Sequence, residues 1–140
     1  MIKEIIFSFQ GVKGAYSELA GINLFKNSNS LPCKTFEEMF EAVRKNYAKV
    51  ALVPIENSRA GRVADTQRLI PESNLKIIGE YFLEVNHCLL ALPGTSIKDI
   101  KRIHSHEQAI AQCRNNIIRC KKEMLVAADT AGAAKMISEL

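Results

Sequence analysis

The sequence of 140 residues contains no apolar run that approaches the roughly 20 residues of a membrane-spanning helix. Residues 1–10 turn polar too quickly to form a secretory signal peptide, so the sequence predicts a cytoplasmic protein that binds no membrane. No stripe of basic residues interleaved with aromatic ones is present. The formal charge of +4 therefore indicates a solvated surface or a small anionic ligand rather than a nucleic-acid partner.

Cysteine is scarce and widely spaced. The sequence contains neither a C-x-x-C pair nor a histidine cluster, so we expect no metal site and reduced, structural thiols. The four cysteines are Cys33, Cys88, Cys113 and Cys120. Cys113 and Cys120 are separated by roughly 10 Å along the axis of a predicted helix, which is too far for a disulfide bond between them.

The residues that are abundant are typical of a globular protein. Hydrophobic residues make up 47% of the chain and charged residues 24%, without a low-complexity linker or an internal repeat. A chain of this length forms one packed domain, or two small lobes that share an interface.

The apolar pattern predicts strands that alternate with helices. Expected strands cover residues 2–9, 31–35, 50–55, 103–105 and 124–127. Expected helices begin after residues 14 and 35, run through residues 63–70 to an end at Pro71, and cover residues 106–119 and 130–140. A capping box of Thr35 and Glu38 marks the start of the second helix. This alternation predicts an α/β fold with mostly parallel sheets, and the unbroken apolar run 50–55 predicts a strand buried on both faces.

Residues 75–92 form a long extended region. At 18 residues it exceeds an ordinary strand, so we expect two strands, or one that passes between two lobes. Any boundary between lobes has to fall in this crossover, because no linker is present elsewhere. We therefore expect a first α/β lobe in residues 1–80 and a second in residues 81–140.

Four polar clusters each follow the end of a predicted strand and open a helix. They are Gly11-Val12-Lys13-Gly14, Glu56-Asn57-Ser58-Arg59-Ala60-Gly61, Ser105-His106 and Asp129-Thr130. Ligands of open α/β sheets bind beyond the carboxyl ends of strands, where helix N-termini offer unpaired N–H groups and a partial positive charge. The shared placement predicts a binding site for a small anion.

Each cluster also has a purely structural explanation. A tight turn that needs glycine explains Gly11 and Gly14. A polar turn explains Asn57 and Ser58. A helix N-cap explains Asp129 or Thr130. Ser105 and Gln108 form the pattern S-x-x-Q of a capping box, and His106 is only a minor catalytic candidate. The joint pattern, rather than any single cluster, favours a ligand site.

The same segments resemble the prephenate dehydratase family. The most specific likeness is Val53-Pro54-Ile55-Glu56-Asn57-Ser58, followed by Gly61, Val63 and Thr66. It is joined in order by Gly11-Val12-Lys13-Gly14-Ala15-Tyr16-Ser17, by Gly79-Glu80 leading to His87, by Ser105-His106-Glu107-Gln108-Ala109 with Gln112, and by Thr130-Ala131-Gly132-Ala133-Ala134. The resemblance covers residues 7–134.

The resemblance implies conversion of prephenate to phenylpyruvate, with loss of water and carbon dioxide and without a metal or organic cofactor. It implies a two-lobed, periplasmic-binding-protein-like (type II) fold, with the site in the cleft and residues 75–92 as the hinge. The family's active-site positions fall on Glu56, Asn57, Ser105 and Gln112, which are expected to be catalytic. Beside them, Ser58 and Thr130 are expected to bind the substrate.

The family pattern continues beyond the matched segment. Family members go on to a Thr-Arg-Phe motif, which serves the departing hydroxyl and binds a carboxylate, and usually to an ACT domain that binds phenylalanine. We therefore expect an incomplete second lobe, and impaired activity unless a complementing C-terminal fragment supplies the motif. The family also tends to form homodimers.

Two other functions stay open from the sequence. The chain is a noncatalytic lobe that holds a small anion at its helix termini, or it acts on arogenate in place of prephenate. Arogenate carries an ammonium group, so it requires a carboxylate near the cleft.

Overall fold

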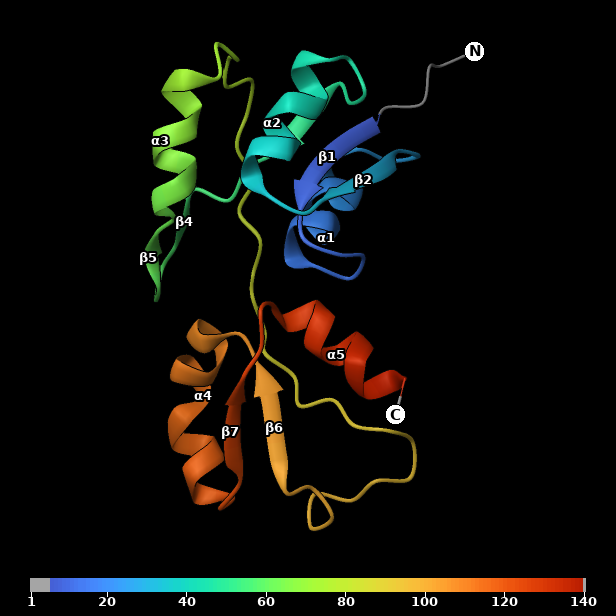
Figure 1. The fold of residues 1–140 in the computed structure, drawn as a ribbon, viewed down its shortest axis with the longest axis vertical. Coiled ribbons are helices and arrows are strands. Elements are labelled where there is room, and N and C mark those ends of the chain that lie inside the picture. The colour runs from blue at the N-terminus through green and yellow to red at the C-terminus, as the bar shows by residue number, and fades with distance from the viewer. Residues whose placement is uncertain (1–5, 140) are drawn as a thin grey trace. The chain divides into compact units, whose positions relative to one another are not determined.

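A computed structural model describes residues 6–139 of the chain (Figure 1). The chain divides into two compact units, Met1–Glu84 and Val85–Leu140. Each unit contains parallel strands joined through helices, and a short antiparallel hairpin is the exception. The predicted α/β class with mostly parallel sheets is therefore confirmed.

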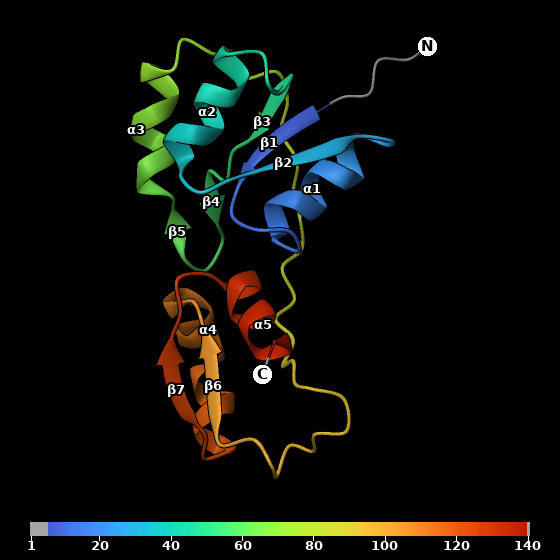
Figure 2. The same ribbon diagram turned by 45° about the vertical axis from the view of Figure 1, so that its right-hand side comes forward.

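The first unit is built on a three-stranded sheet in the order β2-β1-β3. Strand β1 (Ile6–Gln10) lies in the middle, between β2 (Asn29–Cys33) and β3 (Val50–Leu52) (Figure 2). Helix α1 (Tyr16–Leu24) connects β1 to β2, and α2 (Phe36–Arg44) connects β2 to β3. Both strand pairs are parallel, so the carboxyl ends of all three strands lie at the same edge of the sheet.

Strand β1 is buried on both faces because a helix packs on each. Phe7, Ser8 and Phe9 are each 0% exposed. The ring of Phe7 packs against that of Phe25, which caps α1, with ring centroids 6.2 Å apart. Ser8 points to the opposite face, where its hydroxyl donates to the carbonyl oxygen of Met39 on α2 at 2.9 Å. The alternation of side chains along one strand thus ties two helices to the sheet.

The start of α2 matches one half of the predicted capping box. The backbone N–H of Glu38 donates to Oγ1 of Thr35 at 3.1 Å, as predicted. The carboxylate of Glu38 accepts from the backbone N–H of Lys34 at 2.8 Å, and not from that of Thr35. The reciprocal bond therefore closes one residue earlier than a standard capping box does.

The segment after α2 differs from the prediction. Strand β3 ends at Leu52 and its three residues are only half-buried, so a strand over residues 50–55 buried on both faces is wrong. Within the described residues β3 pairs with β1 alone, which leaves its other edge without a strand. The chain then forms a hairpin of β4 (Glu56–Asn57) and β5 (Gly61–Arg62), where the sequence predicted only a polar turn.

Helix α3 (Ala64–Glu72) continues through Pro71, so the predicted end at this proline is wrong. Proline removes one backbone hydrogen bond, but its fixed φ is compatible with a helix. The helix ends instead at Glu72, and the backbone N–H of its C-cap, Ser73, donates to the carbonyl oxygen of Leu69 at 2.9 Å. Asn74 then takes a left-handed conformation with φ of 59°, which is a common way to terminate a helix.

Residues 75–92 form an extended segment without a strand among the described residues. The prediction of one or two strands here is therefore wrong. Extended backbone becomes a strand only when a neighbouring chain supplies a ladder of hydrogen bonds, and no strand of residues 6–139 pairs with this segment.

The second unit contains one parallel strand pair with a helix after each strand. Strand β6 (Arg102–Ser105) pairs with β7 (Glu123–Val126), and the helices are α4 (Glu107–Arg119) and α5 (Thr130–Ser138). Among residues 6–139 no helix combines the length and apolar content needed to cross a bilayer.

The predicted S-x-x-Q capping box is wrong. The N-cap of α4 is His106, whose Nδ1 accepts from the backbone N–H of Gln108 at 3.3 Å. Ser105 stays in β6, where its carbonyl oxygen accepts from the backbone N–H of Ala127 at 2.8 Å. This hydrogen bond to the chain after β7 holds Ser105 in the strand, so the helix begins one residue later.

Candidate active site

The turn between β1 and α1 contains the first polar cluster. Gly11 and Gly14 have φ values of 120° and 92°, which side-chain-bearing residues rarely adopt, so the predicted glycine turn is confirmed. The carboxylate of Glu18, on α1, anchors this turn from the protein interior. It accepts from the backbone N–H of Gly14 at 2.6 Å and from the hydroxyl of Ser30 at 2.5 Å, while the residue is only 9% exposed.

The β4–β5 hairpin carries the second cluster, beyond the carboxyl end of β3. Asn57 is half-buried and its Oδ1 accepts from the backbone N–H groups of Arg59 and Ala60, at 2.9 and 3.0 Å. The predicted turn role of Asn57 is thus confirmed for its carbonyl oxygen. Its amide nitrogen makes no hydrogen bond within the part of the chain that the structure describes. Glu56 and Ser58 on the same hairpin are exposed.

In the second unit, two clusters lie at the carboxyl ends of neighbouring strands. Ser105 is the last residue of β6 and stands opposite Val126, the last residue of β7, in the parallel register. Thr130 is the first residue of α5, and residues 127–129 separate it from the end of β7. The N-cap of that helix is Asp129, whose Oδ1 accepts from the backbone N–H of Gly132 at 2.6 Å. The predicted N-cap is therefore Asp129, while the hydroxyl of Thr130 is not used for capping.

Gln112 lies on α4, on a half-buried position. Its Oε1 lies 3.2 Å from Nε2 of His87, which lies in the extended segment at the start of the second unit. A histidine N–H that donates to Oε1 leaves the amide nitrogen of Gln112 as the donor for a ligand. His87 thus supports a predicted site residue through a contact that the sequence alone does not indicate.

The predicted site residues form two groups, one in each unit. Glu56, Asn57 and Ser58 share one hairpin of the first unit, and Ser105, Gln112 and Thr130 surround one strand pair of the second. Within each unit the residues follow the carboxyl ends of strands, as predicted. Their roles in catalysis and binding stay predictions.

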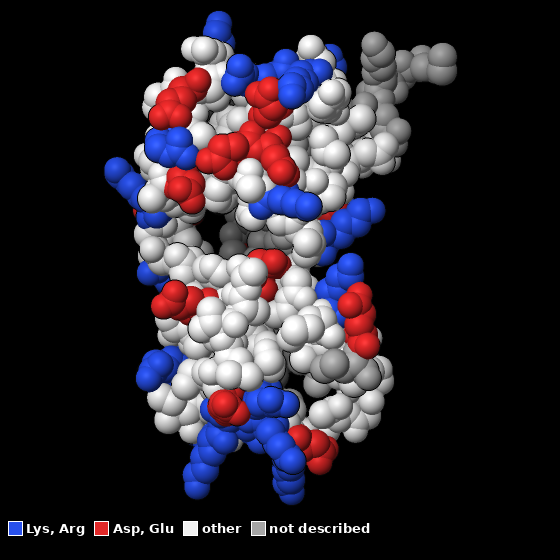
Figure 3. Space-filling view, viewed as in Figure 1, with Lys and Arg blue, Asp and Glu red and all other residues white. Residues whose placement is uncertain are grey.

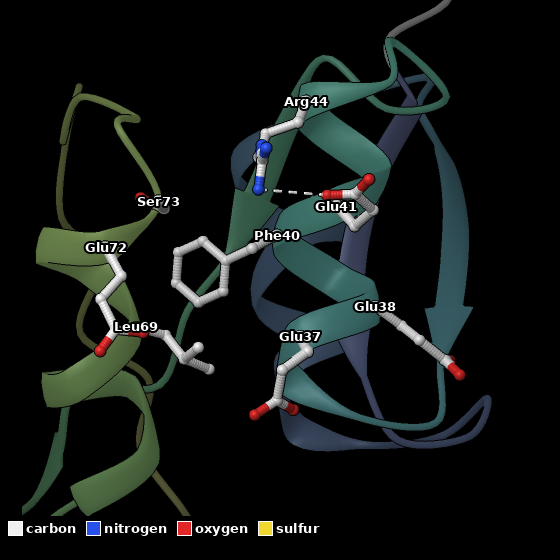
Figure 4. A pocket seen from close by; sticks show the side chains of 8 residues that line it. All are labelled: Glu37, Glu38, Phe40, Glu41, Arg44, Leu69, Glu72 and Ser73. Atoms are coloured by element: carbon white, nitrogen blue, oxygen red, sulfur yellow. Dashed lines mark ion pairs between the residues drawn. The ribbon is translucent and has the colours of Figure 1, made fainter.

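A surface hollow in the first unit contains none of these residues. It has a volume of about 430 Å³ and lies between α2 and α3 (Figure 4). Its floor is Phe40 and Leu69, and glutamates dominate its rim, as the acidic area of Figure 3 shows for this face. On that rim the pKa of Glu37 is lowered, first by its own backbone N–H and then by the guanidinium of Arg68, 2.9 Å away. The acidic rim makes the hollow unsuited to a dicarboxylate such as prephenate.

Among residues 6–139 no group of three or more His, Cys, Asp or Glu side chains is arranged to hold a metal ion. The four cysteines are free thiols, and Cys33 is buried. Burial raises the pKa of the Cys33 thiol, and the negative charge of Glu38 raises it further. This thiol is therefore a packing group and not a nucleophile.

Comparison with known proteins places these features in one family. The sequence profile described as "Prephenate dehydratase" matches residues 7–140. A bifunctional N-acyl-homoserine lactone acylase/prephenate dehydratase of Komagataeibacter europaeus is 46% identical over 136 residues, which are 97% of this chain and 48% of that protein. The chloroplastic arogenate dehydratase/prephenate dehydratase 2 of Arabidopsis thaliana is 44% identical over 131 residues, which are 94% of this chain and 34% of that protein.

Solved structures give the same result. A prephenate dehydratase of Arthrobacter aurescens, in complex with L-Phe, superposes with a TM-score of 0.89 at 32% identity, covering 96% of this chain and 46% of that one. The prephenate dehydratase of Staphylococcus aureus superposes with a TM-score of 0.79 at 26% identity, covering 95% of this chain and 51% of that one. The chain thus spans about half of these solved chains and of the Komagataeibacter relative, and a third of the Arabidopsis one. Because the family profile matches residues 7–140, the chain belongs to the prephenate dehydratase family.

Proposed function

We propose that this chain forms part of a prephenate dehydratase and carries most of the groups that hold the substrate. The observation that supports the proposal is the family match over residues 7–140, combined with polar side chains at the carboxyl ends of parallel strands in both units. Those strand ends are where open α/β sheets bind anionic ligands.

The reaction breaks two bonds of prephenate. The electron pair of the bond to the ring carboxylate moves into the ring as carbon dioxide leaves, and the ring hydroxyl departs as water after it accepts a proton. The ring becomes aromatic and the product is phenylpyruvate. Aromatisation supplies the driving force, so the protein has to position two carboxylates and provide a donor for the departing oxygen.

Three donors suit that task. The amide nitrogens of Asn57 and Gln112 are available because Oδ1 of Asn57 is used inside the hairpin and Oε1 of Gln112 lies against His87. The hydroxyl of Ser105 follows the end of β6. We assign these groups to hydrogen bonds with the carboxylates and the hydroxyl of prephenate. Ser58 and Thr130 bind the substrate beside them, and Glu56 polarises a neighbouring donor or holds the hairpin in shape.

The proposal includes a complementing C-terminal fragment with the Thr-Arg-Phe motif, which the family pattern places after the matched segment. The extended segment of residues 75–92 supports this part of the proposal, because large apolar side chains are exposed to solvent there. Ile77, Ile78 and Phe82 are 76%, 79% and 87% exposed. Such a surface is typical of one that packs against another part of the protein. A lobe boundary near residue 80, a homodimer and a cytoplasmic location belong to the same proposal.

Turnover of prephenate tests the proposal. The purified chain, alone and mixed with the C-terminal half of the Arthrobacter aurescens enzyme, is incubated with prephenate, and phenylpyruvate is followed by its absorbance in alkali. We expect product in the mixture and little or none from residues 1–140 alone, because the family pattern places a charge-stabilising donor after the matched segment, and loss of such a donor costs about 2.7 to 4 kcal/mol of barrier. Binding of prephenate without product in either sample favours a noncatalytic anion-binding lobe.

Arogenate is a second candidate substrate, since relatives of this chain are named arogenate dehydratases. Glu56 is exposed on the hairpin and is the carboxylate nearest in sequence to Asn57, so it is available to an ammonium group. The same assay with arogenate distinguishes the two substrates. Faster turnover of arogenate than of prephenate assigns the chain to that reaction.

A further inference from the structure

The hydroxyl of Thr66 lies buried at the base of the β4–β5 hairpin. Thr66 is in the first turn of α3 and is 0% exposed. Its Oγ1 lies 2.8 Å from the carbonyl oxygen of Pro54 and 2.9 Å from that of Val63. A hydroxyl has a single proton, so it donates to only one of these oxygens at a time.

Pro54 is the acceptor that depends on this proton. The carbonyl oxygen of Val63 already accepts from the backbone N–H of Gln67 at 3.2 Å. The carbonyl oxygen of Pro54 follows the end of β3, and it has no other donor within the part of the chain that the structure describes. The hydroxyl of Thr66 therefore satisfies a carbonyl that the sheet leaves without a partner.

Two hydrogen bonds close the base of the hairpin. One is that of Thr66 to Pro54, and the other runs from the backbone N–H of Val63 to the carbonyl oxygen of Ile55 at 3.0 Å. Glu56 and Asn57 follow directly after these anchored residues. A small change in the direction of the chain at Pro54 therefore moves both side chains, and catalytic groups tolerate displacements of only about 1 Å.

We propose that Thr66 is a positioning residue of the candidate active site. Its hydroxyl fixes the direction in which the chain leaves β3, and so holds Glu56 and Asn57 where they meet the substrate. The inference rests on the proposed function for its catalytic consequence, while the effect of Thr66 on the hairpin is independent of any substrate.

Two substitutions separate the hydroxyl from the methyl group. Thr66→Val keeps the shape of the side chain and removes the donor, whereas Thr66→Ser keeps the donor and removes the methyl group from a fully buried position. We expect Thr66→Val to lower kcat/KM for prephenate about fivefold, the value of one net hydrogen bond, in whichever sample turns over prephenate. Thr66→Ser is expected to retain the parent kcat/KM within about twofold, although it is the variant that loses buried apolar contact.

A role in packing alone predicts the opposite order of the two variants. Parent-like turnover in Thr66→Val, or an equal loss in Thr66→Ser, overturns the inference. Should Thr66→Val fail to fold, Thr66→Ala replaces it. The kcat/KM of Thr66→Ser for prephenate then has to exceed that of Thr66→Ala by about fivefold, and equal kcat/KM values overturn the inference.

Hydrogen exchange tests the same claim without a substrate. The backbone N–H of Val63 is expected to exchange about fivefold faster in Thr66→Val than in the parent and in Thr66→Ser, because it closes the same hairpin base. Unchanged exchange overturns the inference. If the three proteins show this exchange pattern but the parent neither binds nor converts prephenate, the proposed function fails while the positioning of the hairpin by Thr66 stands.

Discussion

Oε1 of Gln112 lies 3.2 Å from Nε2 of His87, so the side-chain amide of Gln112 is oriented by a residue 25 positions earlier in the chain. The contact lies within the second unit and joins α4 to the extended segment at the start of that unit. It fixes which end of the amide is available to a ligand, because a histidine N–H that donates to Oε1 leaves the nitrogen free to donate elsewhere.

Replacing His87 by alanine tests this orientation. We expect His87→Ala to weaken prephenate binding about fivefold, because Gln112 then loses the hydrogen bond that orients it. The measurement is the Kd from calorimetric titration. Gln108→Ala is the matched control, since Gln108 is an exposed residue of the same helix and its variant is expected to bind like the parent. Equal affinity of His87→Ala and the control contradicts the orientation by His87.

Glu18 is expected to stabilise the glycine turn through its carboxylate. Glu18→Met keeps the approximate size of the side chain but removes both oxygens, so the backbone N–H of Gly14 loses its acceptor. Its free energy of unfolding should fall by about 1.5 to 3 kcal/mol, the range for a hydrogen bond to a charged group. Ser30→Ala removes the other partner and should cost less, about 1 kcal/mol. Denaturant titration measures both, and a larger effect of Ser30→Ala contradicts the assignment.

Gly21 has no room for a side chain. A Cβ at this position would lie 2.2 Å from Cε2 of Phe7, whose ring is 0% exposed and has no space to retreat into. Gly21→Ala should therefore destabilise the protein by about 1 to 3 kcal/mol, even though alanine favours a helix by about 1 kcal/mol relative to glycine. Gly79→Ala is the control, because nothing lies within 4 Å of its Cβ position. A thermal transition of Gly21→Ala at or above that of the control contradicts the packing described for α1.

The four thiols should differ in reactivity. Cys33 is 7% exposed and its pKa is raised by burial, so at a given pH less of it is thiolate than of an ordinary cysteine. Cys88 and Cys120 are exposed. With an aromatic disulfide reagent at pH 8, we expect Cys88 and Cys120 to react first and Cys33 to react only after denaturation. Peptide mapping by mass spectrometry assigns the labels, and early labelling of Cys33 contradicts its burial.

Local patterns in the sequence were sufficient for the main elements. The strand predicted over residues 2–9 overlaps β1 from Ile6 on, and its first part, residues 2–5, lies outside the described residues. Helix α2 was predicted because apolar residues recur at helical spacing and because Thr35 and Glu38 mark a helix start. Pro71 misled the prediction, since a proline in the last turn of a helix removes only one hydrogen bond. Strands were wrongly predicted in residues 75–92, because an apolar extended pattern cannot reveal whether a neighbouring strand is present.

The sequence placed the candidate residues Asn57, Ser105 and Thr130 after strand ends, and their roles stay predictions. It did not indicate the contacts that support them. Two supporting contacts, from Thr66 to Pro54 and from His87 to Gln112, join residues 12 and 25 positions apart. Such contacts depend on tertiary packing, so no local pattern in the sequence encodes them. The same holds for the hairpin, whose form depends on Oδ1 of Asn57 accepting two backbone hydrogen bonds.

The most direct test of the proposed function, in which Asn57 and Gln112 both hydrogen-bond to prephenate, is a double-mutant cycle on kcat/KM for prephenate. It uses Asn57→Ala, Gln112→Ala and the double variant in whichever sample turns over prephenate. Each single variant should lower kcat/KM about tenfold, and the double variant should lose less than the product of the two, because groups on one substrate are coupled. Single variants within about threefold of the parent contradict the claim, since a lost interaction of 1 kcal/mol already gives about fivefold.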